Sequence, residues 1–130
     1  MQIRDLLSEK RLSHLEEMVA EIDVQELKTK IDNGEIFKLV EVSNPADFKK
    51  GHIKGAIPIP LESLRDAAPQ KFRKFQQIVV YCKESNSSVG VAAARILQRL
   101  GFSNVLLLKG GKEHWQQAGL PLESDGHDQS

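Results

Sequence analysis

The feature that most constrains the fold is the stretch from residue 78 to residue 100, where a strand pattern changes into a helix pattern. Residues 78–81 are β-branched or aromatic, which is typical of a buried parallel strand. A polar segment then separates this run from apolar side chains at helical spacing, which are Val89, Ala92, Ala93, Ile96, Leu97 and Leu100. Gly101 is a suitable helix stop. The stretch therefore predicts a strand, a tight loop and a helix, with Cys82 at the start of the loop.

Cys82 is the only cysteine of the chain, and its position favours a chemical role. The first backbone N–H groups of a helix have no intrahelical partners, and together with the helix dipole they favour a negative charge. If residues 83–88 curl around Cys82, its thiolate is favoured over its thiol, and the thiolate is the nucleophilic form. The alternative is a buried and inert cysteine, since free Cys is among the most buried residue types. The place at the end of a strand favours the reactive interpretation.

Further apolar runs extend this unit into an alternating strand and helix pattern. We expect four short apolar strands, at residues 36–42, 56–59, 78–81 and 105–108. Pro58 and Pro60 place the second of them at an edge of the sheet, because proline cannot donate a ladder hydrogen bond. Strands that alternate with helices imply a parallel sheet covered on both faces, with Cys82 outside the carboxyl end of a central strand.

Helix signals lie between these strands. Besides the helix of residues 89–100, we expect helical segments at residues 23–33, 45–50 and 61–75, the last as short separate turns, and after residues 110–111. Asp23 and Glu26 have the spacing of a capping box. We expect Phe48 in the core, and Trp115 as the core anchor of the last helix rather than as a residue that stacks on a substrate.

The chain divides into three parts. Residues 1–21 have apolar side chains at helical spacing, which continue to Ile22 and predict one or two amphipathic helices. These helices pack on the domain or serve dimerisation or partner binding, and the sequence leaves both open. Residues 22–122 form one α/β domain of a size that suits a single core. Residues 123–130 form a polar tail, expected to be flexible.

Composition narrows the function classes. The net charge of zero, with 28% charged residues, argues against a nucleic-acid footprint, and no segment resembles a membrane span or a signal peptide. One cysteine cannot form an internal disulfide, so we expect a cytoplasmic location. The four histidines lie far apart in the sequence, so we expect no structural zinc site and no cofactor.

Three motifs resemble those of the rhodanese-homology sulfurtransferases. Residues 80–88 read Val-Tyr-Cys-Lys-Glu-Ser-Asn-Ser-Ser and resemble the family's active-site loop, often written Tyr-Cys-Arg-Ser-Gly-Asn-Arg-Ser. Residues 51–56 match the family's Gly-His-Ile-x-Gly-Ala segment, and residues 110–115 match its Gly-Gly-x-x-x-Trp ending. The resemblance covers roughly residues 22–122. It implies a rhodanese-type three-layer sandwich, with a central five-stranded parallel sheet and helices on both faces.

The resemblance also implies a site. Cys82 would accept a sulfane sulfur as a persulfide and pass it to a nucleophilic acceptor. The substrate-binding or persulfide-binding loop would consist of Lys83, Glu84, Ser85, Asn86, Ser87 and Ser88, and the supporting residues would be Glu41 and His52. An imidazole could act as a base, but the equivalent histidine in this fold usually has a structural hydrogen-bonding role.

The loop departs from the family pattern at two positions. Lys83 and Ser87 stand where arginines are common, and Glu41-Val42-Ser43 replaces the family's Asp-Val-Arg. Lysine keeps a positive charge but lacks the bidentate fork of arginine. Glu84 opposes an anionic donor by like-charge repulsion. We therefore expect weak recognition of thiosulfate, and a persulfide or a protein persulfide as an alternative donor.

We consider three functions. The first is sulfur transfer between a small sulfur donor, or a protein donor, and a thiol or cyanide-like acceptor. The second is a phosphatase of the related dual-specificity type, which needs Cys-x5-Arg; because Ser88 stands where that arginine would be, the sequence argues against this function. The third is a catalytically weak module used for protein binding or regulation. The first is the function that we predict, with no nucleic-acid or membrane partner.

Overall fold

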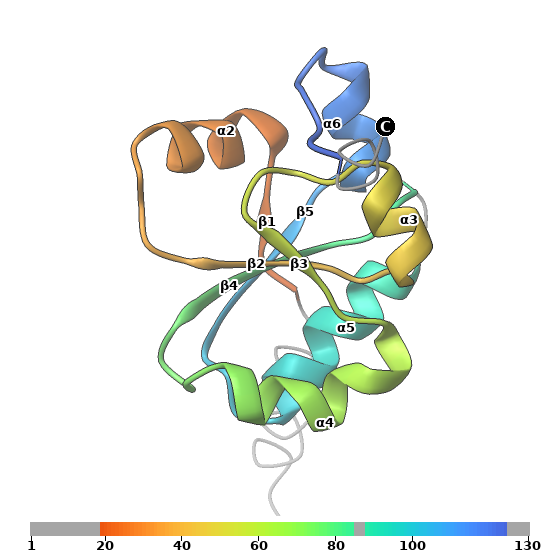
Figure 1. Ribbon diagram of the computed structural model, residues 1–130. Helices are drawn as coiled ribbons and strands as arrows, with labels where there is room; N and C mark the ends of the chain where they lie inside the picture. The colour runs from red at the N-terminus through yellow and green to blue at the C-terminus, as the bar shows by residue number, and fades with distance from the viewer. Residues whose placement is uncertain (1–18, 85–87, 125–130) are drawn as a thin grey trace, which may run out of the picture.

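A five-stranded parallel sheet forms the centre of the molecule, in a computed structural model that describes residues 19–84 and 88–124 (Figure 1). Its strands, in the spatial order β1-β5-β4-β2-β3, are β1 (Glu21–Ile22), β2 (Lys38–Glu41), β3 (Ala56–Pro58), β4 (Gln77–Tyr81) and β5 (Asn104–Leu108). Every neighbouring pair is parallel. The predicted fold class, a parallel sheet between two helical layers, is confirmed.

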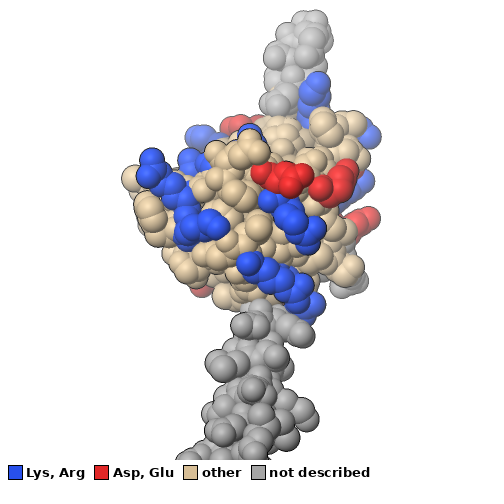
Figure 2. Space-filling view, turned by 90° about the horizontal axis from the view of Figure 1, so that it is seen from below, with Lys and Arg blue, Asp and Glu red and all other residues tan. Residues whose placement is uncertain are grey.

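Five described helices cover the two faces of this sheet: α2 (Val24–Asp32), α3 (Pro45–Lys50), α4 (Leu61–Lys71), α5 (Ser88–Arg99) and α6 (Gly111–Gln117). Helices α4 and α5 lie below the sheet in Figure 1, while α2 and α6 lie above it. The face of the molecule that is seen from below carries scattered Lys and Arg side chains and a few acidic ones (Figure 2). No helix in the described part of the chain is long and apolar enough to cross a bilayer.

Strand β4 is central and is buried on both faces. Val80 is paired with Val40 of β2 and with Leu107 of β5, and residues 78–81 are fully buried. Successive side chains of a strand point to opposite faces. Ile78 and Val80 therefore join the core beneath α4 and α5, while the other two residues of this run join the core beneath α2, α3 and α6. This burial fixes the direction in which the chain leaves β4 and enters the cysteine loop.

Several predicted details are confirmed. The Asp23 carboxylate accepts a hydrogen bond from the Glu26 backbone N–H, and the Glu26 side chain accepts one from the backbone of Asp23, which completes the capping box of α2. Strand β3 is an edge strand, as its prolines predict. Phe48 and Trp115 are both in the core, at 6% and 2% exposure.

The structure corrects three expectations. Ile22 belongs to β1 and pairs with Leu108, so the helical prediction is wrong there; a two-residue strand is too short to show an alternating pattern. Residues 61–71 form one helix with Pro69 inside it, because Leu64 and Ala68 are buried in the core shared with α5. Strand β2 begins at Lys38, and residue Ile36 before it is 95% exposed. The helices predicted for residues 1–18 lie outside the described residues.

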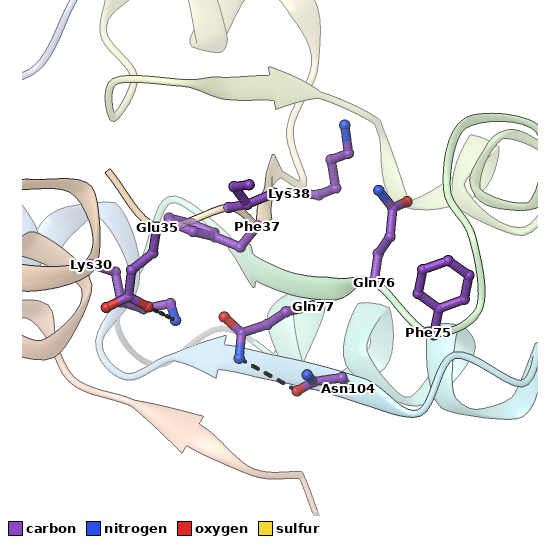
Figure 3. Close-up of a pocket in the computed structure, with 9 residues that line it drawn as sticks. Lys30, Glu35, Phe37, Lys38, Phe75, Gln76, Gln77 and Asn104 are labelled. Carbon is purple, nitrogen blue, oxygen red and sulfur yellow. Dashed lines mark hydrogen bonds and ion pairs between the residues drawn. The ribbon is translucent and has the colours of Figure 1, made fainter. Parts of the chain in front are cut away.

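The amino ends of the strands border a pocket of about 480 Å³ (Figure 3). Gln77 and Asn104, the first residues of β4 and β5, contribute to its wall, and the ion pair between Lys30 and Glu35 borders it. Cys82 follows the carboxyl end of β4, so this pocket lies at the opposite end of the sheet from the cysteine.

Candidate active site

Cys82 follows β4 directly and is 6% exposed. Its thiol donates a hydrogen bond to the backbone carbonyl of Glu84, with 3.3 Å between Sγ and the oxygen. On another side, Gly90 in the first turn of α5 approaches so closely that a Cβ there would lie 3.3 Å from Sγ and 2.8 Å from Leu107. The sulfur therefore lies against the N-terminal turn of a 12-residue helix, the end whose dipole favours negative charge.

Most of the buried positions of α5 carry small residues. The buried residues of this helix are Gly90, Ala93, Ala94 and Leu97, while Val89 and Ile96 of the predicted apolar stripe are half-buried and pack against the same core. Small side chains allow the helix backbone to reach the sulfur.

Helix α6 holds the backbone of the cysteine loop. The Lys112 N–H donates to the Cys82 carbonyl at 2.8 Å, and the Glu113 N–H donates to the Lys83 carbonyl at 2.9 Å. These donors belong to the first turn of α6, where backbone N–H groups lack intrahelical partners. Gly111 has a φ of +63°, and a Cβ there would lie 2.5 Å from the Cys82 carbonyl oxygen. The Gly110-Gly111 turn and the first residues of the cysteine loop thus pack directly against each other as one unit.

A buried hydrogen-bond network lies beside this unit, with the fully buried Glu41 at its centre. Glu41 Oε1 accepts from the Tyr81 hydroxyl at 2.7 Å, and Oε2 accepts from Lys112 Nζ at 3.0 Å. Ser43 Oγ donates to the same Oε2. The Tyr81 hydroxyl in turn accepts from the Ile53 N–H at 3.1 Å. Burial and the adjacent Glu41 carboxylate raise the pKa of Tyr81, so it stays protonated as a donor.

Lys112 is also buried, and its ammonium group has no spare donor. Besides Glu41, Nζ lies 2.7 Å from the Gly51 carbonyl and 3.4 Å from the Asp47 carbonyl. An ammonium group has three N–H donors, so these three acceptors account for all of them. The side chain of Lys112 therefore connects β2 to the segment after α3, while its backbone holds Cys82.

His52 makes hydrogen-bonding and stacking contacts within the domain. Its Nδ1 lies 2.9 Å from the Phe48 carbonyl oxygen, and its ring stacks on Phe48 with 3.8 Å between ring centroids. Its backbone pairs in both directions with Glu123, which ties the end of the described chain to the domain. These contacts match the structural alternative given for His52.

The other predicted loop residues are only partly described. Lys83 and Glu84 are exposed, and Ser88 opens α5 as an exposed residue. Ser85, Asn86 and Ser87 lie outside the described residues, and so do the backbone donors expected from them. In the described part of the chain, no group of three His, Cys, Asp or Glu side chains is arranged to hold a metal ion.

Lys112 is the site-forming residue that the sequence analysis missed. A signal was present, because Glu41 ends an apolar strand and a buried carboxylate needs a cationic or hydrogen-bonding partner. The family pattern would supply an arginine at the position of Ser43. In this chain the cation comes instead from Lys112, which is 71 residues from Glu41 in the sequence.

Comparisons with known proteins agree with this architecture. The family profile described as rhodanese-like domain matches residues 23–118. A protein named Sulfurtransferase from Allochromatium vinosum is 31% identical over 105 residues, which cover 81% of this chain and 95% of that protein. Thiosulfate sulfurtransferase GlpE from Vibrio cholerae is 34% identical over 87 residues, which cover 66% of this chain and 78% of that protein.

Solved structures agree as well. The rhodanese-like domain of an Anabaena sp. protein superimposes with a TM-score of 0.74 at 32% identity, over 82% of this chain and 80% of that one. A Bacillus halodurans protein superimposes with a TM-score of 0.76 at 27% identity, over 91% of this chain and 86% of that one. Together with the match over residues 23–118, these likenesses show that the chain belongs to the rhodanese-like domain family.

Proposed function

We propose that the chain is a rhodanese-type sulfurtransferase or persulfide carrier in which Cys82 holds the transferred sulfur. The observation that carries this proposal is the position of the single cysteine: Cys82 leaves the central strand at its carboxyl end, and Sγ lies against the first turn of α5. A thiolate or a terminal persulfide sulfur is stabilised by the positive end of a helix dipole. Two relatives named as sulfurtransferases support transfer over a role in binding alone.

The chemistry proceeds in two displacement steps. The Cys82 thiolate attacks the sulfane sulfur of the donor, the donor's S–S bond breaks, and sulfite or a thiolate leaves with the bonding electrons. Cys82 then carries the sulfur as a persulfide. An acceptor thiolate attacks the outer sulfur, and Cys82 leaves as a thiolate, ready for another cycle. Helix α6 fixes the loop carbonyls while these bonds form and break.

The loop sequence favours a donor other than thiosulfate. Lys83 offers a flexible point charge, and Ser87 offers no charge where the family often has an arginine fork. The Glu84 side chain is exposed, so its repulsion of an anionic donor is screened by solvent. A persulfide, free or on a protein, needs less anion recognition than the thiosulfate dianion.

Intact mass spectrometry tests the proposal directly. We expect the folded chain to gain one sulfur atom after incubation with a low-molecular-weight persulfide, more completely than with thiosulfate, and cyanide to remove it. Cys82→Ser should abolish the gain. If neither donor modifies the folded wild-type protein, the chain is not a sulfurtransferase, and the rhodanese-like module used for protein binding becomes the better assignment.

A further inference from the structure

We propose that the substrate thiol or persulfide carries a carboxylate, and that a shallow pocket beside the cysteine loop binds this carboxylate. Lys50 and Lys83 are the residues that contact it. This inference rests on the proposed function, because it concerns the substrate of the same site. It assigns a chemical class to that substrate: a low-molecular-weight thiol or persulfide whose sulfur lies at Cys82 while its carboxylate reaches the pocket.

The pocket has a volume of about 150 Å³ and lies among α3, α6 and the first residue of the loop after Cys82. Its walls include three lysines, Lys50, Lys83 and Lys112, and one acid, Asp47. The volume suits a carboxylate with a short methylene arm rather than a whole large ligand. A small pocket with several cations around it is suited to an anion.

The three lysines are not equivalent. Lys112 is buried, and its ammonium group is fully used by Glu41 and two backbone carbonyls. Lys50 and Lys83 are exposed, and neither makes an ion pair with another described residue. With Lys112 neutralised by Glu41, two cations face the single Asp47 carboxylate, which leaves one excess positive charge at the pocket.

The backbone that carries the two lysines is held next to the cysteine loop. Lys83 directly follows Cys82, and the carbonyls of both residues are held by the first turn of α6. Lys50 is in the last turn of α3, and Gly51 after it is held by Lys112 Nζ. Helix α6 thus holds the backbone at both contact lysines: the Glu113 N–H holds the Lys83 carbonyl, and Lys112 Nζ holds the carbonyl of Gly51, the residue after Lys50.

Alkylation of Cys82 measures the subsite without requiring sulfur transfer. We compare maleimidohexanoate with its neutral amide, which carry equal arms, and take the ratio of their rate constants at Cys82 of the full chain. The carboxylate should be favoured by the wild type. Lys50→Gln and Lys83→Gln should each lower the ratio about two- to fivefold, the range of a solvent-exposed ion pair. Asp47→Asn should raise it.

Lys49→Gln is the matched control, because Lys49 is the neighbouring exposed lysine of α3 and does not line the pocket. It should leave the ratio unchanged. High salt should reduce the ratio of the wild type toward that of the two lysine variants, since exposed charges are screened. Equal rates for the two reagents with the wild type, or the same drop in Lys49→Gln as in Lys50→Gln, would overturn the subsite.

Transfer to a thiol distinguishes failure of the subsite from failure of the proposed function. Persulfide-loaded protein is mixed with mercaptohexanoate or with mercaptohexanol, and loss of the outer sulfur is followed by mass. We expect faster loss with the carboxylate thiol, and a smaller preference in Lys50→Gln. Loss at equal rates would overturn the subsite while leaving sulfur transfer intact. Failure to load sulfur at all would overturn the proposed function, whereas the alkylation ratio would still decide the subsite.

Discussion

At the scale of single residues, Lys112 has two functions that depend on different atoms. Its backbone N–H holds the Cys82 carbonyl, and its buried ammonium group neutralises Glu41. A buried carboxylate that loses its only cation keeps the full cost of desolvation. The chain therefore depends on Lys112 for the stability of the network as well as for the position of the loop.

Lys112→Met tests the contribution of the side chain. We expect the free energy of unfolding to fall by about 3–5 kcal/mol, because Glu41 remains buried without its cation. Urea denaturation measures the change. Lys109→Met is the control, since Lys109 is an exposed lysine nearby in the sequence and should change the stability by no more than about 0.5 kcal/mol.

A second variant identifies the cause. Glu41→Gln removes the buried charge but keeps an acceptor for the Tyr81 hydroxyl. Combined with Lys112→Met, it should recover part of the lost stability, because no uncompensated charge is left. If the double variant is as unstable as the sum of the two single variants, the ion pair is not what Lys112 contributes.

At the scale of elements, the site depends on how α6 and α5 meet the end of β4. Each helix needs a glycine at its point of contact: Gly111 lies against the Cys82 carbonyl, and Gly90 lies against the sulfur. These contacts place two helix starts around one cysteine. Neither helix can move away without releasing the loop.

Gly111→Ala tests this coupling. Alanine at a positive φ costs about 1–2 kcal/mol through backbone strain alone. At Gly111 the added Cβ also collides with the Cys82 carbonyl, so we expect a larger loss of stability than this. We also expect Cys82 to be loaded with persulfide sulfur at least about tenfold more slowly than in the wild type. Gly119→Ala is the matched control, because Gly119 has a φ of +80° but open space around it. Equal loading rates in the two variants would show that the contact with α6 does not position Cys82.

The elements also show where local sequence signals suffice. The capping box of α2 lies within four residues, so it was predicted and is present. Residues 61–75 were predicted as short helical turns, but burial of Leu64 and Ala68 keeps α4 continuous through Pro69. Strand β1 was not predicted, because two residues are too few to show an alternating pattern. Its position depends on the edge of β5, with which it pairs.

At the scale of the whole molecule, the elements around Cys82 gather at the carboxyl ends of the parallel strands. The larger pocket lies at the opposite end and is bordered by side chains from the strand starts (Figure 3). Open α/β sheets place their sites at the carboxyl ends, where the loops of neighbouring strands converge. The location of Cys82, rather than the size of a pocket, is therefore the basis of the proposed site.

Alkaline unfolding reports on the buried network as part of the whole fold. The pKa of Tyr81 is raised by burial and by Glu41, so the folded protein keeps this proton while the unfolded chain loses it above about pH 10. The folded state then binds more protons, and stability falls as pH rises beyond that value, by up to about 1.4 kcal/mol per pH unit. Below about pH 10 the contribution is fully present.

The chain has one tyrosine, so the absorbance of tyrosinate follows Tyr81 alone. We expect this absorbance to appear together with the loss of helical circular dichroism. Tyr81→Phe should lack this part of the alkaline slope, but it should lose about 1–3 kcal/mol at neutral pH because Glu41 and the Ile53 N–H lose a partner. Ionisation of Tyr81 in a protein that is still folded would contradict the assigned environment.

The sequence by itself determined the order of strands and helices from α2 onward, the edge position of β3 and the place of Cys82 after the central strand. These properties follow from apolar period, capping residues and prolines, which act over a few neighbouring residues. Only the tertiary structure decided that Lys112 is the counterion of Glu41, that Gly90 lies against the sulfur and that Lys50 lies beside Lys83 at one pocket. The physical reason is that a buried charge, a close backbone contact and a shared pocket each depend on which distant segments become neighbours, and packing of the sheet and its two helical layers sets those neighbours.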